Sequence, residues 1–184
     1  MKNLPNYLTY LRILLIPVII ALFFIPSAAA AWAALGLYTV ASITDFLDGY
    51  LARKWNVESA FGRFLDPISD KIFIASLLVT LVGFDRLDGI WIVPVIIILM
   101  REFLVAGLRE FLGPMNIQLP VSVLAKWKTT IQMIALGFLV VGDYGDVILP
   151  RTLEIGQWGL AIAAILTVVT GWSYLKAGLK HIPR

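Results

Sequence analysis

The sequence contains no cysteine and only one histidine. The lack of cysteine excludes disulfide bonds, cysteine-based metal sites and cysteine nucleophiles. Charge is also scarce, because Asp, Glu, Lys and Arg make up 15% of the chain and none of them occurs from Ile13 to Thr44. The histidine, His181, stands close to Pro183 near the end of the chain, where we expect a solvated side chain. Functional chemistry is therefore sought among the few carboxylates and basic side chains.

What the chain has in abundance is apolar surface. Its hydrophobic fraction is 60% and its mean hydropathy is +0.88, whereas soluble domains average about 45–50% apolar residues. These values indicate an integral membrane protein, and 184 residues are enough for one domain. A net charge of +3 suits anionic lipids, while the scattering of the basic residues argues against a nucleic-acid partner.

The apolar stretches predict an all-α fold with six transmembrane helices, since a spanning helix needs about 20 mostly apolar residues. A short N-terminal segment, residues 2–7, is expected to lie along the membrane interface. Pro67 is expected in the first turn of the third helix, where proline is tolerated. The six predicted helices cover approximately residues 8–25, 29–53, 66–84, 89–112, 121–141 and 152–179.

The distribution of basic residues predicts the orientation. If both termini and the loops at 54–65 and 113–120 share one side, that side holds 13 of the 15 Lys and Arg and only Arg86 and Arg151 lie opposite. The two sides then carry net charges of +6 and −3. By the positive-inside rule the first side is cytoplasmic, so we expect the active site there as well.

Four carboxylates stand out in the stretch 45–70. Asp45 and Asp48 are spaced three apart, and Asp66 and Asp70 four apart, so each pair lies on one face of a helix. Hard divalent cations prefer carboxylate oxygens, two such ions would cancel four negative charges, and a two-metal centre suits phosphoryl transfer. The alternative is that these acids form a solvated loop between two helices.

The residues between the acids support the catalytic interpretation. Gly49 and Ala52 are small and leave room for a ligand beside the backbone, and Arg53 offers a fork-shaped partner for a diphosphate. A solvated loop would not require two same-face acid pairs with glycines at these positions.

The pattern Asp-x2-Asp-Gly-x2-Ala-Arg-x8-Gly-x3-Asp-x3-Asp, from Asp45 to Asp70, resembles the signature of the CDP-alcohol phosphotransferase family. The resemblance implies a single membrane domain over residues 1–184 that transfers a substituted phosphoryl group from a CDP-alcohol to a second alcohol and releases CMP. It implies two divalent cations, Mg²⁺ or Mn²⁺, held by Asp45, Asp48, Asp66 and Asp70, with Asp70 also acting as the general base. The implied CDP-lipid-binding residues are Asn6, Thr9, Gly49, Ala52, Arg53, Ser59 and Gly62.

Three further stretches, 3–12, 101–111 and 125–132, are similar to the bacterial members of this family that make phosphatidylglycerophosphate. The implied substrates are CDP-diacylglycerol and sn-glycerol 3-phosphate, and the implied products are phosphatidylglycerophosphate and CMP. Arg109, Lys126 and Lys128 are the candidates for binding the acceptor's phosphate, and contact with lipid phosphates is the simpler alternative for each. Inositol phosphate or serine remains open as the acceptor.

Two other classes of protein also place acids in a membrane. A cation transporter would explain the carboxylates but not Gly49, Ala52, Arg53 and Gly62 at their spacing. An intramembrane prenyltransferase would need a second Asp-rich motif and more helices. The family resemblance further implies a homodimer in the bacterial cytoplasmic membrane, and the charge bias described above predicts that both termini lie in the cytoplasm.

Overall fold

The computed structural model describes the backbone of residues 4–55, 60–115 and 122–179, and most of their side chains outside 4–9, 46–55, 60–64, 66, 67, 177 and 179. Within these ranges the chain is all-helical, with six α-helices and no strand, as the sequence predicts. The α-helices are α1 (Leu4–Phe23), α2 (Ala28–Trp55), α3 (Ala60–Gly83), α4 (Ile92–Leu112), α5 (Val123–Val141) and α6 (Thr152–Leu179). Short 3₁₀ turns are η1 (Gly89–Trp91), η2 (Gly113–Met115) and η3 (Gly142–Val147).

Two helix starts differ from the sequence prediction. Helix α1 already begins at Leu4, so residues 4–7 form its first turn and are not a separate segment. Helix α3 begins at Ala60, about two turns before the expected start, which places Pro67 inside the helix. The apolar residues Phe61, Phe64 and Leu65 continue the i, i+3, i+4 periodicity ahead of the proline, and this periodicity outweighs the breaking effect of Pro67.

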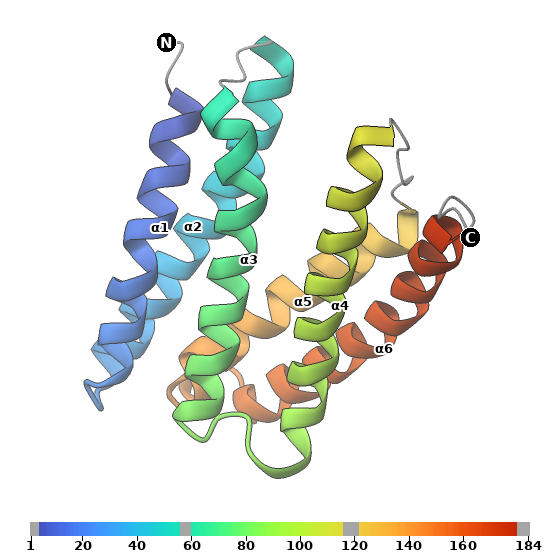
Figure 1. Ribbon diagram of the computed structural model, residues 1–184. Coiled ribbons are helices and arrows are strands. Elements are labelled where there is room, and N and C mark those ends of the chain that lie inside the picture. The colour runs from blue at the N-terminus through green and yellow to red at the C-terminus, as the bar shows by residue number, and fades with distance from the viewer. Residues whose placement is uncertain (1–3, 56–59, 116–121, 180–184) are drawn as a thin grey trace. The chain divides into compact units, whose positions relative to one another are not determined.

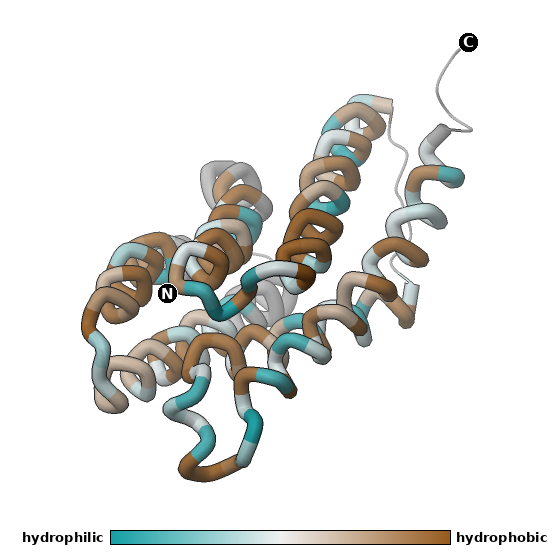
Figure 2. Tube along the Cα trace, turned by 90° about the horizontal axis from the view of Figure 1, so that it is seen from below, coloured by the Kyte–Doolittle hydropathy of each residue, from teal (hydrophilic) through white to brown (hydrophobic). Residues whose placement is uncertain are grey.

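Several helices have the length and composition of membrane spans. Among the described residues, the segments Gly89–Met115, Val123–Val147 and Thr152–Lys176 meet both criteria, and Tyr10–Phe23 is a shorter apolar helix. Figure 2 shows hydrophobic residues along the coloured parts of the helices, with hydrophilic residues between them. These features indicate a membrane-bound protein.

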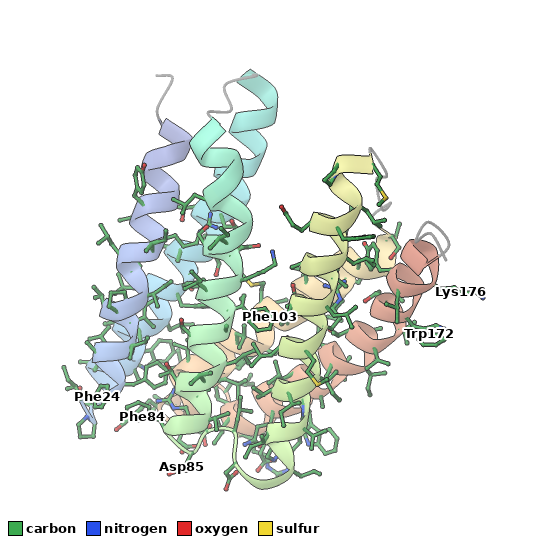
Figure 3. The ribbon with its side chains drawn as sticks, viewed as in Figure 1. Phe24, Phe84, Asp85, Phe103, Trp172 and Lys176 are labelled. Atoms are coloured by element: carbon green, nitrogen blue, oxygen red, sulfur yellow. The ribbon has the colours of Figure 1, made fainter. Side chains whose placement is uncertain are left out.

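The described residues form two compact units, the first within 1–86 and 137–153 and the second within 87–136 and 154–184. In the first unit, α1 packs against both α2 and α3 (Figure 1). The rings of Tyr38 on α2 and Phe73 on α3 stack with their centroids 5.8 Å apart. Phe24 and Phe84 meet edge-to-face at 4.9 Å where α1 and α3 end (Figure 3), so aromatic contacts tie the three helices together.

Arg86 links three segments of the first unit through its guanidinium. Its guanidinium donates hydrogen bonds to the carbonyl oxygens of Leu139 and Val140 and lies over the ring of Phe23. Burial lowers the pKa of Arg86, and the charge of Asp143 acts in the opposite direction. A cavity of about 160 Å³ beside Arg86 is lined mainly by apolar side chains. The contacts at this end of the unit therefore serve packing.

In the second unit, small residues let α6 approach α4. A methyl group added at Gly171 would lie 2.9 Å from Cγ of Arg101, and one at Gly178 would lie 2.7 Å from the side chain of Leu108. The rings of Trp91 and Trp158 meet edge-to-face at 5.1 Å. Close helix packing through small residues is typical of membrane proteins, where backbones approach without a hydrophobic driving force.

Gly145 provides a stability prediction. A Cβ at this position would lie 2.6 Å from Cγ2 of Thr152 and 2.9 Å from Cγ1 of Val141, so Gly145→Ala is expected to destabilise the protein by about 1–3 kcal/mol through overpacking. Gly36→Ala is the control, because a Cβ there meets nothing within 4 Å. Thermal unfolding in detergent should show a clearly lower midpoint for Gly145→Ala only. Equal midpoints would show that Thr152 and Val141 move aside freely.

Candidate active site

The acidic motif is distributed over two neighbouring helices of the first unit. Asp45 and Asp48 lie on α2, and Asp66 and Asp70 lie on α3. The structure describes the side chains of Asp45 and Asp70; those of Asp48 and Asp66 lie outside the described residues. The motif is therefore helical where it was predicted to be, and one acid from each pair can be placed in detail.

A single guanidinium links Asp45 to Asp70. Nη2 of Arg12, on α1, lies 2.5 Å from Oδ1 of Asp45, and Nη1 lies 3.6 Å from Oδ1 of Asp70. The same Nη1 donates a hydrogen bond of 3.4 Å to Oγ of Ser69. Two of the four predicted metal ligands thus approach one positive group, although they come from different helices.

The exposure of these groups increases outward from the arginine. The side chain of Arg12 is 2% exposed, that of Asp45 37% and that of Asp70 58%. A ligand can therefore approach the acids from the accessible side while Arg12 closes the buried side. The oxygen donors of the two acids and the open approach fit a hard divalent cation. Among the described side chains no group of three or more metal-ligating residues occurs, so the full ligand set remains a prediction.

Six of the seven predicted CDP-lipid residues lie on the same three helices. Asn6 and Thr9 belong to α1, Gly49, Ala52 and Arg53 to α2, and Gly62 to α3. The side chains of these six residues lie outside the described part of the structure, and so does Ser59 as a whole. Their roles stay predictions.

A second polar cluster lies in the second unit. Nζ of Lys128, on α5, is 2.7 Å from Oε1 of Glu102 on α4, and Nη1 of Arg101 is 2.9 Å from the same oxygen. Lys128 is only 5% exposed, and Gln132, one turn further along α5, is also buried. Oε1 of Gln132 lacks a hydrogen-bond donor among the described residues, which leaves an acceptor available to a ligand.

The three predicted acceptor-binding residues have different surroundings. Lys128 is buried in the cluster with Glu102, whereas Lys126 is exposed because it lies on another side of α5. Arg109 is exposed on α4, with its guanidinium 5.6 Å from the ring centre of Tyr174. Among the residues that the structure describes, an ion pair holds Lys128 in a defined position.

Sequence reasoning assigned no role to Arg12 and no specific partner to Glu102. The available signal was the rarity of charge, since Arg12 precedes the longest uncharged stretch and Glu102 lies within an apolar helix. Ionisable residues in such places are costly and usually functional. Apart from Arg101, which precedes Glu102 on α4, the partners described above lie on other helices and become visible only in the folded chain.

Comparison with known proteins identifies the family of this chain. The CDP-alcohol phosphatidyltransferase family profile matches residues 2–169, and the chain belongs to this family. A Rickettsia typhi relative, 50% identical across 96% of this chain and 97% of its own length, is named CDP-diacylglycerol–glycerol-3-phosphate 3-phosphatidyltransferase. Relatives of the same name occur in Cereibacter sphaeroides, 39% identical over 98% of this chain and 97% of the relative, and in Escherichia coli, 33% identical over 95% and 92%.

Proposed function

We propose that this protein transfers the phosphatidyl group of CDP-diacylglycerol to sn-glycerol 3-phosphate and produces phosphatidylglycerophosphate and CMP. The observation that carries the proposal is near-full-length similarity to relatives named for this reaction, at up to 50% identity. A second support is that Asp45 on α2 and Asp70 on α3, one acid from each predicted pair, contact the same guanidinium. A cation transporter is disfavoured because the chain belongs to a family of transferases.

Asp45, Asp48, Asp66 and Asp70 would hold two divalent cations, Mg²⁺ or Mn²⁺. When bound, these ions would neutralise the diphosphate and the charge that develops on it. Arg53 would form a forked contact with the diphosphate.

Asp70 would act as general base, because its side chain is the more exposed of the two described acids. The 1-hydroxyl oxygen of glycerol 3-phosphate forms a bond to the β-phosphorus, and the bond from this phosphorus to the bridging oxygen breaks. CMP leaves with that oxygen, and the hydroxyl proton passes to the Asp70 carboxylate. A carboxylate within hydrogen-bond reach of an attacking hydroxyl suits this transfer.

Lys128, Arg109 and Lys126 would bind the phosphate of the acceptor, with Lys128 the principal contact. We further propose that the protein is a homodimer of the bacterial cytoplasmic membrane, with both termini and the reaction on the cytoplasmic side. The strong excess of basic residues on that side supports the orientation.

An acceptor panel tests this function. Purified protein in detergent receives CDP-diacylglycerol with glycerol 3-phosphate, inositol phosphate or serine, and CMP release is measured with Mg²⁺ and with EDTA. We expect release with glycerol 3-phosphate alone, and loss of release in EDTA that excess Mg²⁺ or Mn²⁺ restores. Release with another acceptor would change the assigned substrate. Absence of release with every acceptor at high Mg²⁺ and Mn²⁺ would contradict the proposed chemistry.

A further inference from the structure

Arg12 is a cation that the proposed reaction does not use. It lies on the apolar helix α1 and is 2% exposed. A buried, charged side chain is strongly unfavourable unless it is paired and hydrogen-bonded. Its contacts with Asp45, Asp70 and Ser69 give partners to both terminal nitrogens, so these contacts are the reason an arginine can occupy the position.

The geometry suits an arginine in particular. One terminal nitrogen, Nη2, contacts the acid on α2, and the other, Nη1, contacts the acid and the hydroxyl on α3. A planar guanidinium can serve two partners in fixed directions, whereas the ammonium of lysine is a single point of charge. The fork of Arg12 therefore sets the position of Asp45 relative to Asp70.

Arg12 contacts the two carboxylates from their buried side. Both acids contact Arg12 through Oδ1, and an ionised carboxylate can accept on two oxygens. Because Asp45 and Asp70 are far more exposed than Arg12, a divalent cation reaching them arrives opposite the guanidinium. The arginine and the cation then compete for the negative charge of the same two groups.

We propose that Arg12 is the internal counter-ion of the acidic motif, a positioning residue that holds Asp45 and Asp70 together and opposes divalent-cation binding to them. The inference rests on the proposed cation site and adds to it a residue outside the family signature. Two consequences follow. Without Arg12 the acids repel one another in the absence of cations, and a divalent cation binds them more tightly because a neighbouring positive charge is gone.

The test compares Arg12→Met with wild type in Mn²⁺ titrations followed by electron paramagnetic resonance, and in thermal unfolding with EDTA or saturating Mg²⁺. We expect Mn²⁺ to bind Arg12→Met about tenfold more tightly. The unfolding midpoint should fall markedly in EDTA and much less in Mg²⁺, because tighter binding to the folded state stabilises it more. We also expect a lower kcat, since the acids are no longer held in place.

Arg86→Met is the matched control, because it removes another partly buried guanidinium from the same unit, one that contacts backbone carbonyls. Its loss of stability should be the same in EDTA and in Mg²⁺, and its Mn²⁺ affinity should equal that of wild type. Arg12→Lys, which keeps the charge without the fork, should retain a wild-type Mn²⁺ affinity but lose kcat.

If Arg12→Met does not fold, the double variant Arg12→Met/Asp45→Asn removes both members of the closer pair and is expected to fold. It should be at least as stable in EDTA as Asp45→Asn alone, because Asp45→Asn leaves the buried Arg12 guanidinium without its closer partner. An Mn²⁺ affinity of Arg12→Met within twofold of wild type, or weaker, would overturn the inference, as would equal stability losses with and without Mg²⁺. Failure of wild type itself to bind Mn²⁺ would instead remove the cation site and the proposed function.

Discussion

Asp70→Asn is expected to lower CMP release from CDP-diacylglycerol and glycerol 3-phosphate by at least about a hundredfold, the usual contribution of a positioned general base. The substitution keeps the shape of the side chain but removes the charge that faces Arg12 and the capacity to accept the proton. Because Asp70 is more than half exposed, the loss should fall on turnover more than on folding. Initial rates in detergent, together with the unfolding midpoint, separate the two effects.

Asp88→Asn serves as its control, because Asp88 is an exposed acid outside the motif, just before η1. The control should keep wild-type turnover. Wild-type turnover by Asp70→Asn would remove the base assignment and leave only the remaining acids as candidates.

Lys128→Met is expected to raise the KM for glycerol 3-phosphate by about tenfold or more, since hydrogen bonds to charged groups contribute about 1.5–3 kcal/mol. Lys128 is buried beside Glu102, so it meets a ligand with little competition from water. Lys126→Met should produce a smaller rise, because the Lys126 side chain is exposed and exposed charges interact weakly.

The matching control is Lys176→Met, an exposed lysine near the end of α6 (Figure 3). It should leave the KM for the acceptor unchanged. Steady-state kinetics, with glycerol 3-phosphate varied at saturating CDP-diacylglycerol, gives the KM of all three variants. A larger effect at Lys126 than at Lys128 would contradict the assignment of the principal phosphate contact.

Much of the fold follows from the sequence because the signals are local. Six apolar stretches separated by Gly, Pro and charged residues predict six helices, and six α-helices occur in the described part of the chain. The predicted start of α3 at residue 66, which puts Pro67 in the first turn, is wrong, because the helix begins at Ala60. The apolar periodicity of residues 61–65 was the better guide.

The candidate site was predictable as a motif but not as a set of contacts. The spacing of Asp45, Asp48, Asp66 and Asp70 places them on helix faces, which is a local property. The pairing of Arg12 with acids on α2 and α3 depends on how α1 packs against both helices. Spacing along the chain does not contain this information.

The two lysines of α5 illustrate the same limit. Lys126 and Lys128 are equivalent in composition and nearly adjacent in sequence, but only Lys128 faces Glu102. Residues two apart point in nearly opposite directions on a helix, so the direction of α5 relative to α4 decides which lysine is buried. This direction is a property of the folded second unit.

Equilibrium binding of Mn²⁺ tests the central claim most directly. In the presence of CDP-diacylglycerol, wild type is expected to bind two Mn²⁺ ions per chain, close enough for their electron spins to couple. Asp45→Asn and Asp70→Asn should each bind fewer than two. Failure of wild type to bind Mn²⁺, or two coupled ions that persist in both variants, would contradict a cation site built from the acids of α2 and α3.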